Sequence, residues 1–330
     1  MITLPKLTRK RRKAMKKSLK RFLLSFLMVA FAFVAVPGVK ASASVSQTGA
    51  TQNSITIQWT PGSKALRYRV YVGESYSTAK LYATLPASAT SATISGLPAG
   101  SEKYVKVEYD YQGYSKVYTS TAGTKYDAKT LPGKVTGLRQ KSWWYFSKSF
   151  DAIWDRQAGA DGYEWIVYKS NGKKFRQGKT TYNSMQPQFQ AQKISNNMVY
   201  SAKVRAYTTI NGKQYVGAWS DPAYFFTQPR VTKASVSGNK LTVKWKKVSG
   251  ATGYTVYVST KPKKGYKKVK TVGKNTSSVT ISKLKGKKFS PKKKYYVYVA
   301  TNKKVGKRRY DSGKLYYWDT KSPTSRFNYF

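Results

Sequence analysis

The stretch KLTVKWKKVSGATGYTVYVS, residues 240–259, places a tryptophan, Trp245, nine positions before a tyrosine, Tyr254. Apolar residues alternate with polar ones before the tryptophan and after the tyrosine, and a short Gly/Ser/Ala segment separates the two runs. A period of two on both sides of a turn predicts a half-buried β-hairpin. The two rings are therefore either a platform for a ligand or part of the core of a small β-domain.

The same pattern occurs three times along the 330-residue chain. The tryptophan and tyrosine of the three copies are Trp59, Tyr68, Trp154, Tyr163, Trp245 and Tyr254. The tryptophans are 95 and 91 residues apart, which is too long for a solenoid repeat and fits a complete sandwich domain. Each ring shares a strand face with alternating apolar residues, and burying such a ring removes about 150–250 Å² from water. We therefore expect all six residues in a core rather than at a ligand.

A later strand also repeats, and a tyrosine opens it in two of the copies. Tyr200 and Tyr295 each begin a run in which small or apolar residues occupy alternate positions. In the first copy, Tyr104 is out of phase with the alternation of Val105 and Val107. A bulge or a shifted corner is expected there.

Together these landmarks resemble fibronectin type III domains, with Trp on the second strand, Tyr on the third and Tyr295-x-Val297-x-Val299 on the sixth. The segments TLPGKVTGL (130–138) and WSDPAYFFT (219–227) add to the resemblance, and WKKVSGATGYTVY is similar to domains of secreted proteins from Gram-positive, clostridia-like bacteria. The resemblance covers residues 45 to about 320. It implies an all-β chain of three tandem immunoglobulin-like, antiparallel β-sandwiches.

The expected boundaries follow the repeat and two Pro-containing linkers at residues 130–133 and 227–230. We expect a signal peptide at 1–43, fibronectin type III-like domains at 44–130, 131–229 and 230–320, and a C-terminal tail at 321–330.

The N-terminus has the pattern of a secretory signal peptide. Ten basic residues between positions 6 and 21 precede FLLSFLMVAFAFVAV (22–36), and small residues follow. Cleavage is expected between Ala43 and Ser44. The apolar run is shorter than the roughly 20 residues that span a bilayer, which favours a cleaved signal peptide. The alternative is an uncleaved membrane anchor. Either way, the protein is expected outside the cytoplasm, secreted or associated with the cell wall.

The composition argues against an enzyme. The chain has no Cys and no His, which removes the commonest nucleophiles, general bases and transition-metal ligands. Its 12 Asp and Glu residues are scattered, without the facing carboxylate pair that a glycosidase needs. The segment GKKFRQGKT (172–180) has five residues between its glycines where a phosphate-binding loop has four. No catalytic residue, cofactor or metal is expected.

Positive charge is concentrated in the last third of the chain. Residues 230–330 contain 28 Lys and Arg against Asp311 and Asp319, whereas 131–229 contain 14 basic and 5 acidic residues. Such a domain attracts polyanions through a field that physiological salt screens over about 8 Å. The candidate polyanion-binding residues are Lys263, Lys264, Lys267, Lys268, Lys270, Lys285, Lys287, Lys288, Lys292, Lys293, Lys294, Lys303, Lys304, Lys307, Arg308 and Arg309. Because they fall on different hairpins and corners, they are not expected to share one face. The alternative is a solvated surface whose lysines prevent sheet-to-sheet pairing.

Surplus aromatic residues form a second candidate surface. If the strand that contains Phe150 extended back through SWWYFS (142–147), Trp144 and Phe146 would face the core, and Trp143 and Tyr145 would be exposed. The other candidate contacts are Tyr111 and Tyr114 in the first domain. Exposed aromatics stack on sugars or dock proteins, and packing between domains is the alternative use.

The sequence therefore favours a non-catalytic adhesion or spacer protein. Its basic third domain would hold an anionic cell-wall polymer or extracellular polysaccharide. One alternative is a structural scaffold that binds other surface proteins, and another is an accessory protein of a glycan-degrading system. Lysines interleaved with tyrosines also resemble the footprint of single-strand nucleic-acid binders. The leader and the lack of a groove-reading motif argue against sequence-specific nucleic-acid binding.

Overall fold

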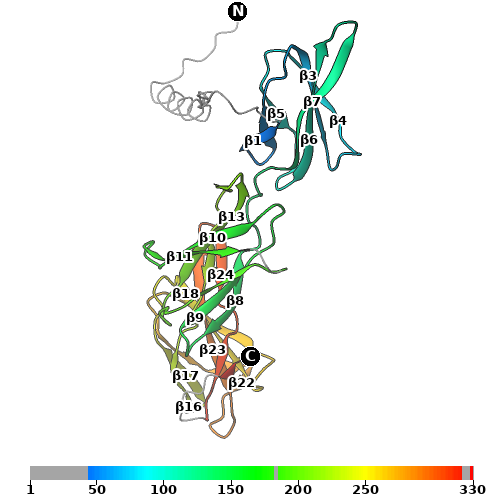
Figure 1. The fold of residues 1–330 in the computed structure, drawn as a ribbon. Helices are drawn as coiled ribbons and strands as arrows, with labels where there is room; N and C mark the ends of the chain where they lie inside the picture. The colour runs from blue at the N-terminus through cyan, green and yellow to red at the C-terminus, as the bar shows by residue number, and fades with distance from the viewer. Residues whose placement is uncertain (1–43, 182–184, 322–327, 330) are drawn as a thin grey trace, which may run out of the picture. The chain divides into compact units, whose positions relative to one another are not determined.

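The computed structural model describes residues 44–181, 185–321 and 328–329. The expected leader and its cleavage residue Ala43 lie outside the described residues, and Ser44 directly precedes the first strand. Every regular element in the described ranges is a β-strand, and these ranges include no helix suited to crossing a membrane. The strands form pairs of antiparallel sheets (Figure 1).

The first sandwich, residues 45–129, pairs a three-stranded sheet with a four-stranded one. The small sheet has the order β1-β2-β5 and consists of β1 (Val45–Ala50), β2 (Ser54–Trp59) and β5 (Ser91–Ser95). The large sheet has the order β4-β3-β6-β7 and consists of β4 (Lys80–Pro86), β3 (Ala65–Gly73), β6 (Glu102–Gln112) and β7 (Val117–Lys129). Residues of both sheets form one core cluster.

The second sandwich, residues 139–225, repeats this order. Its small sheet consists of β8 (Arg139–Trp144), β9 (Ser149–Ile153) and β12 (Gln188–Ala191). Its large sheet has the order β11-β10-β13-β14 and consists of β11 (Lys174–Thr181), β10 (Gly162–Tyr168), β13 (Tyr200–Ile210) and β14 (Lys213–Val216), with β15 (Ala223–Phe225) also paired to β13.

The third sandwich, residues 231–319, has the same arrangement. Its small sheet consists of β16 (Val231–Ser237), β17 (Lys240–Trp245) and β20 (Ser278–Ile281). Its large sheet consists of β19 (Lys267–Gly273), β18 (Gly253–Ser259), β23 (Tyr296–Val305), β24 (Arg308–Asp311), β25 (Tyr316–Asp319) and β26 (Asn328–Tyr329). A two-residue hairpin joins β21 (Lys283–Leu284) to β22 (Lys287–Lys288). The all-β fold of three antiparallel sandwiches is therefore as expected.

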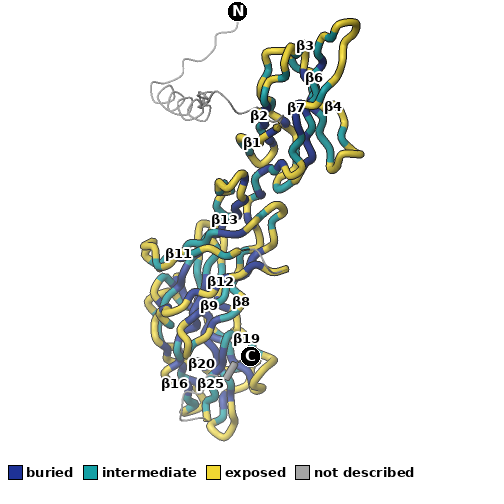
Figure 2. Tube along the Cα trace, in the orientation of Figure 1, coloured by how far each residue is buried: buried dark blue, intermediate teal, exposed yellow. Residues whose placement is uncertain are grey.

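The repeated tryptophan and tyrosine lie in the cores, as their alternation predicts. All six residues of the motif are at most 3% exposed, and the buried interiors are visible in Figure 2. In each sandwich the two rings contact one another, with centroid distances of 5.3, 5.2 and 5.5 Å. The tyrosine hydroxyl also accepts a hydrogen bond from a backbone N–H six residues earlier, at 2.8, 2.9 and 2.8 Å. Each tyrosine therefore packs the core and fixes the preceding loop.

The tyrosines near the start of β13 and β23 fix the corner that leads into each strand. The hydroxyl of Tyr200 accepts from Ser195 N at 2.8 Å, and that of Tyr295 accepts from Ser290 N at 3.1 Å. In the first sandwich the register of β6 on β7 shifts between residues 103 and 105, which confirms the expected bulge. Unlike Tyr200 and Tyr295, Tyr104 packs edge-on against two other tyrosines, Tyr76 and Tyr126.

The second and third sandwiches share core residues where they join. Tyr316, on β25 of the third sandwich, belongs to the core cluster of the second. Phe226 and Val199, which flank strands of the second sandwich, belong to the core cluster of the third. In the joining segment, Gln228 Oε1 accepts from the N–H groups of Leu315 and Tyr316, at 2.8 and 2.9 Å. Side chains of each sandwich thus complete the core of the other.

Candidate functional site

The third sandwich has almost no carboxylate to balance its lysines. Asp319 pairs with Lys294, with 3.1 Å between Oδ2 and Nζ, and this hydrogen bond raises the pKa of Lys294. The other carboxylate, Asp311, accepts from the N–H of Gly313 at 2.8 Å. Both acids of this sandwich therefore already have partners, and the lysine side chains far outnumber them.

The first two sandwiches balance their charges differently. Asp110 forms ion pairs with Arg67 and Arg69. The distances are 2.7 Å from Arg67 Nε to Oδ2 and 2.7 Å from Arg69 Nη2 to Oδ1. Hydrogen bonds from Thr119 and Arg67 hold the pKa of Asp110 below its usual value. In the second sandwich, Glu164 likewise forms ion pairs with cations of its own sheet. Other carboxylates of these sandwiches, such as Asp151 and Asp161, accept hydrogen bonds from neutral side chains or backbone N–H groups.

Four lysines of the third sandwich converge around one hollow. The hollow has a volume of about 220 Å³, and we call it the lysine hollow. Its charged residues are Lys285, Lys287, Lys288 and Lys293, and no carboxylate lines it. Ammonium groups on flexible stems suit anions as point charges without demanding one ligand shape.

Local backbone structure positions these lysines. The β21–β22 hairpin closes through Lys285 and Gly286, whose φ values are 50° and 77°, the left-handed pair that a tight hairpin turn requires. Lys293 lies on the corner that Tyr295 fixes, and its N–H donates to Ser290 O at 3.1 Å. On the opposite wall, Ser259 Oγ donates to Lys264 O at 2.6 Å and closes the segment between β18 and β19.

The sixteen candidate cations do not form one surface. Fifteen are exposed and Lys303 is half-buried. Lys267, Lys268 and Lys270 lie on the edge strand β19, whereas the five cations between positions 303 and 309 lie on the β23–β24 hairpin. The corner at residues 285–293 brings four of them around a common hollow, and Lys268, Lys303, Lys304 and Arg309 line a second one on the large sheet of the third sandwich. Anion binding by any of these residues stays a prediction.

The exposure expected for the SWWYFS segment is wrong for Trp143, Trp144 and Phe146. Trp143 is 4% exposed and lies in the core, whereas Trp144 and Phe146 are 48% and 75% exposed. Strand β8 ends at Trp144, and a turn makes Trp143 the direct partner of the buried Phe150. Direct partners in an antiparallel pair point to the same face, so the turn reverses the phase that a continuous strand would have. Tyr145 is half-buried against the same core.

The other two candidate aromatics lie in the first sandwich. Tyr114 is fully exposed, whereas Tyr111 is half-buried and stacks on Tyr118, with 5.7 Å between ring centroids. Tyr76 and Tyr126 are also strongly exposed on this sandwich. The exposed aromatic surface is therefore centred on the first sandwich.

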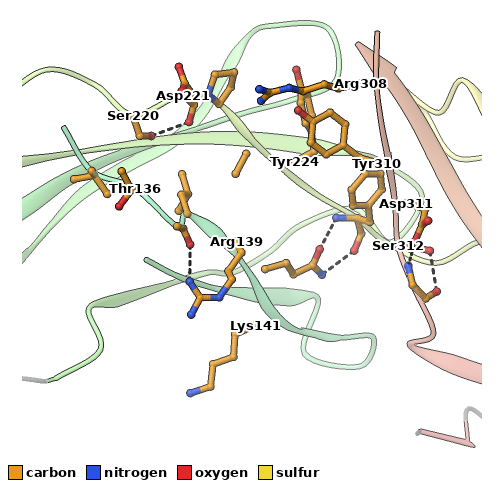
Figure 3. A pocket seen from close by; sticks show the side chains of 18 of the residues that line it. Thr136, Arg139, Lys141, Ser220, Asp221, Tyr224, Arg308, Tyr310, Asp311 and Ser312 are labelled. Carbon is orange, nitrogen blue, oxygen red and sulfur yellow. Dashed lines mark hydrogen bonds between the residues drawn. The ribbon is translucent and has the colours of Figure 1, made fainter. Parts of the chain in front are cut away.

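A larger cleft of about 850 Å³ lies between the second and third sandwiches (Figure 3). Its charges are partly neutralised, because Lys134 pairs with Asp221 at 2.8 Å and Arg139 with Asp155 at 3.3 Å. Arg308, on the hairpin of the third sandwich, faces it from the other side. Sequence patterns do not reveal this cleft, because it exists only where two sandwiches meet.

Groups that could hold a metal ion do not occur among the described residues. No cluster of three or more Asp and Glu side chains with ligand geometry is present in the described ranges. The described carboxylates instead bond Arg, Lys, Thr, Gln or backbone N–H groups.

Two solved structures that match this chain are of tandem fibronectin type III domains. A crystal structure of the FN1–FN3 domains of chicken CNTN1 is 14% identical with a TM-score of 0.30, covering 81% of this chain and 96% of that chain. A two-domain fibronectin type III segment of chicken tenascin is 18% identical with a TM-score of 0.29, covering 55% of this chain and 95% of that chain. No family model and no curated protein matches the sequence.

The chain has the fold of tandem fibronectin type III-like sandwiches. This fold assignment rests on the strand order and the shared core motif of the three sandwiches, because the similarities themselves are too low to carry an argument. An origin in clostridia-like bacteria stays a prediction.

Proposed function

We propose that the protein is a secreted, non-catalytic adhesion or spacer protein whose third sandwich holds an anionic cell-wall polymer or extracellular polysaccharide. The observation that supports this proposal is the lysine hollow, where four lysines and no carboxylate line a space of about 220 Å³. An anion in the hollow gains attraction from all four groups. It also relieves the repulsion among them.

The surrounding charge extends this effect to a polymer. Residues 230–330 carry 28 basic and 2 acidic residues, so the field of the whole sandwich attracts a chain of anions toward the hollow. Contacts between lysines and phosphates release counterions, and each contact contributes a slope of about −0.7 to −0.9 in log affinity against log salt. Adhesion should therefore weaken steeply as the salt concentration rises.

The test uses the full chain and two purified polymers, a glycerol-phosphate polymer and polygalacturonate. Binding is measured by co-sedimentation on immobilised polymer at low and at physiological salt. We expect the unaltered chain to bind at low salt. The test variant replaces the four lysines of the hollow with Gln, and we expect it to lose about tenfold or more in affinity because four polymer contacts are removed.

A matched control variant removes the same charge elsewhere. It replaces four exposed lysines of the second sandwich with Gln, namely Lys141, Lys173, Lys174 and Lys213. The proposal predicts a clearly smaller loss for this control. It is overturned if the unaltered chain binds neither polymer at low salt, or if its binding does not depend on salt.

A second candidate function is that of a scaffold which binds another surface protein. The exposed tyrosines of the first sandwich favour it, because exposed aromatic clusters are typical of protein contacts. Capture of a protein partner that does not depend on salt, and that is lost when Tyr76 and Tyr126 are replaced by Ser, would support this alternative.

A further inference from the structure

The outer face of the large sheet has a charged centre in the first two sandwiches. The position after the core tyrosine is Arg69 in the first sandwich and Glu164 in the second, and each faces an opposite charge on the next strand. Arg69 Nη2 lies 3.8 Å from Glu108 Oε2, and Arg205 Nη2 lies 2.6 Å from Glu164 Oε2. Ion-paired side chains therefore occupy the middle of both sheet faces, and in the second sandwich they line a smaller hollow of about 260 Å³.

The third sandwich has small side chains at the same position. Thr255 follows the core tyrosine there, and its direct partners are Thr271 on β19 and Ala300 on β23. Thr255, which is 6% exposed, lies with Thr271 on the floor of a groove of about 370 Å³. We call it the sheet groove.

The floor of the sheet groove is polar and held in place. Asn302 Nδ2 donates to Thr255 Oγ1 at 2.8 Å, and the hydroxyls of Thr255 and Thr271 lie 3.3 Å apart. Hydroxyl and amide groups both donate and accept, so they match the hydroxyl groups of a sugar. The half-buried ring of Tyr257 lines the same groove and is fixed by stacking on Tyr298, with 4.6 Å between centroids.

The rim of the sheet groove contains an unfavourable pair of charges. Lys304 and Arg309 are direct partners in the β23–β24 hairpin, and like charges in that position destabilise a hairpin. The described registers of β6 on β7 and of β13 on β14 set no two cations opposite each other. Asp311 also lines the groove, and its carboxylate is engaged by the N–H of Gly313. An anion between Lys304 and Arg309 would remove their repulsion.

We propose that the sheet groove binds an acidic saccharide. The cations of the rim hold its carboxylate, sulfate or phosphate group, the floor bonds its hydroxyls, and the Tyr257 ring packs against a sugar face. This proposal rests on the proposed function and deepens it by naming the ligand class. Besides its lysines, the lysine hollow is lined by Ser259, Thr260 and the buried Tyr295, whereas the sheet groove has the half-buried ring of Tyr257.

The test is calorimetric binding of trigalacturonate to the full chain, with tripolyphosphate as an anion without hydroxyls and maltotriose as a neutral sugar. The variant Thr255→Arg places the side chain of Arg69 at its equivalent position, so it fills the groove and adds a positive charge. We expect trigalacturonate affinity to fall about tenfold or more, the size expected for losing one or two hydrogen bonds. Tripolyphosphate affinity should stay unchanged or rise. Undiminished trigalacturonate affinity would overturn the proposal.

If Thr255→Arg does not fold, a pair of double variants tests whether the rim cations of the sheet groove bind the saccharide. Lys304→Gln with Arg309→Gln removes the rim charges, and Lys267→Gln with Lys307→Gln removes the same charge at exposed positions outside the groove. Trigalacturonate affinity should fall about tenfold more in the first pair than in the second, and equal losses would overturn the proposal.

These assays distinguish failure of the sheet-groove proposal from failure of the proposed adhesion function. If the sheet groove is not a site but the proposed function holds, the unaltered chain binds tripolyphosphate and the glycerol-phosphate polymer yet does not distinguish trigalacturonate from them. If the proposed function fails, the unaltered chain binds none of these anions.

Discussion

The ring of Tyr316, in the third sandwich, lies against the indole of Trp143 in the second, with 6.1 Å between the ring centroids. Tyr316 is 1% exposed, and Gln228 in the joining segment accepts from its N–H and donates to its carbonyl. Its hydroxyl also donates to the carbonyl of Pro229. One residue of the third sandwich is thus built into the core of the second, so the stabilities of the two are coupled.

Replacing Tyr316 with Ala should destabilise both sandwiches. The change empties a buried space between them and costs about 3–5 kcal/mol, as for other large aromatic-to-alanine changes in cores. In urea, the second and third sandwiches of the full-length variant should then unfold at two separate midpoint concentrations, whereas those of the unaltered chain unfold together. Tyr114→Ala is the matched control, because this fully exposed ring should change the free energy of unfolding by no more than about 0.5 kcal/mol. A variant indistinguishable from this control would contradict the coupling.

The variant Tyr254→Phe isolates the hydroxyl of the core motif. Without it, the N–H of Val248, a residue only 4% exposed, loses its hydrogen-bond partner. We expect a loss of about 1–3 kcal/mol in the free energy of unfolding, measured in urea. Tyr114→Phe removes an exposed hydroxyl and should be neutral. If the two variants unfold at the same urea concentration, the hydroxyl has no role in fixing the loop.

The variant Lys285→Asn should stabilise the protein. Lys285 has a φ of 50°, a conformation that asparagine adopts more readily than lysine. The expected gain in the free energy of unfolding is about 0.5–1 kcal/mol. Lys287→Asn removes the same charge from the neighbouring strand residue and separates the backbone effect from the relief of repulsion. Equal gains in the two variants would show that repulsion alone is responsible.

The effect of Asp110→Asn should depend on pH. Because the folded-state pKa of Asp110 is lowered, its ion pairs stabilise the protein fully above the ordinary aspartate pKa of about 3.9. That stabilisation is lost as the pH falls through the lower folded-state pKa. Thermal unfolding from pH 7 down to pH 2 should show the unaltered protein more stable at neutral pH, with the difference shrinking in acid. A difference that is constant over this range would contradict the ion-pair role.

The fold could be predicted from local patterns, because strand alternation and the spacing of Trp245 and Tyr254 can be read from one short stretch of sequence. The bulge near Tyr104 could be predicted for the same reason, since it breaks the phase within a single strand. The orientation of Trp143 could not, because it depends on how a turn sets the register between two strands. One residue more or less in that turn reverses every side chain on the returning strand.

The candidate sites could be predicted only in part. Their charge was visible in the composition, since lysines dominate the last third of the chain. The lysine hollow depends on the placement of Lys285 and Lys293 around one space, and the sheet groove depends on Thr255 lying beside Asn302. Such pairings join residues far apart in the chain and follow from strand register rather than from local pattern.

The hydrogen bonds of Gln228 have a mechanical consequence. The segment between the second and third sandwiches is fastened to β25 by Gln228, and Thr301 Oγ1 donates to Thr227 O at 2.9 Å beside it. A pull on the chain therefore meets several hydrogen bonds loaded at once instead of slack in a linker. Under tension, these two sandwiches should transmit force as a stiff element, and any extension should begin elsewhere in the molecule.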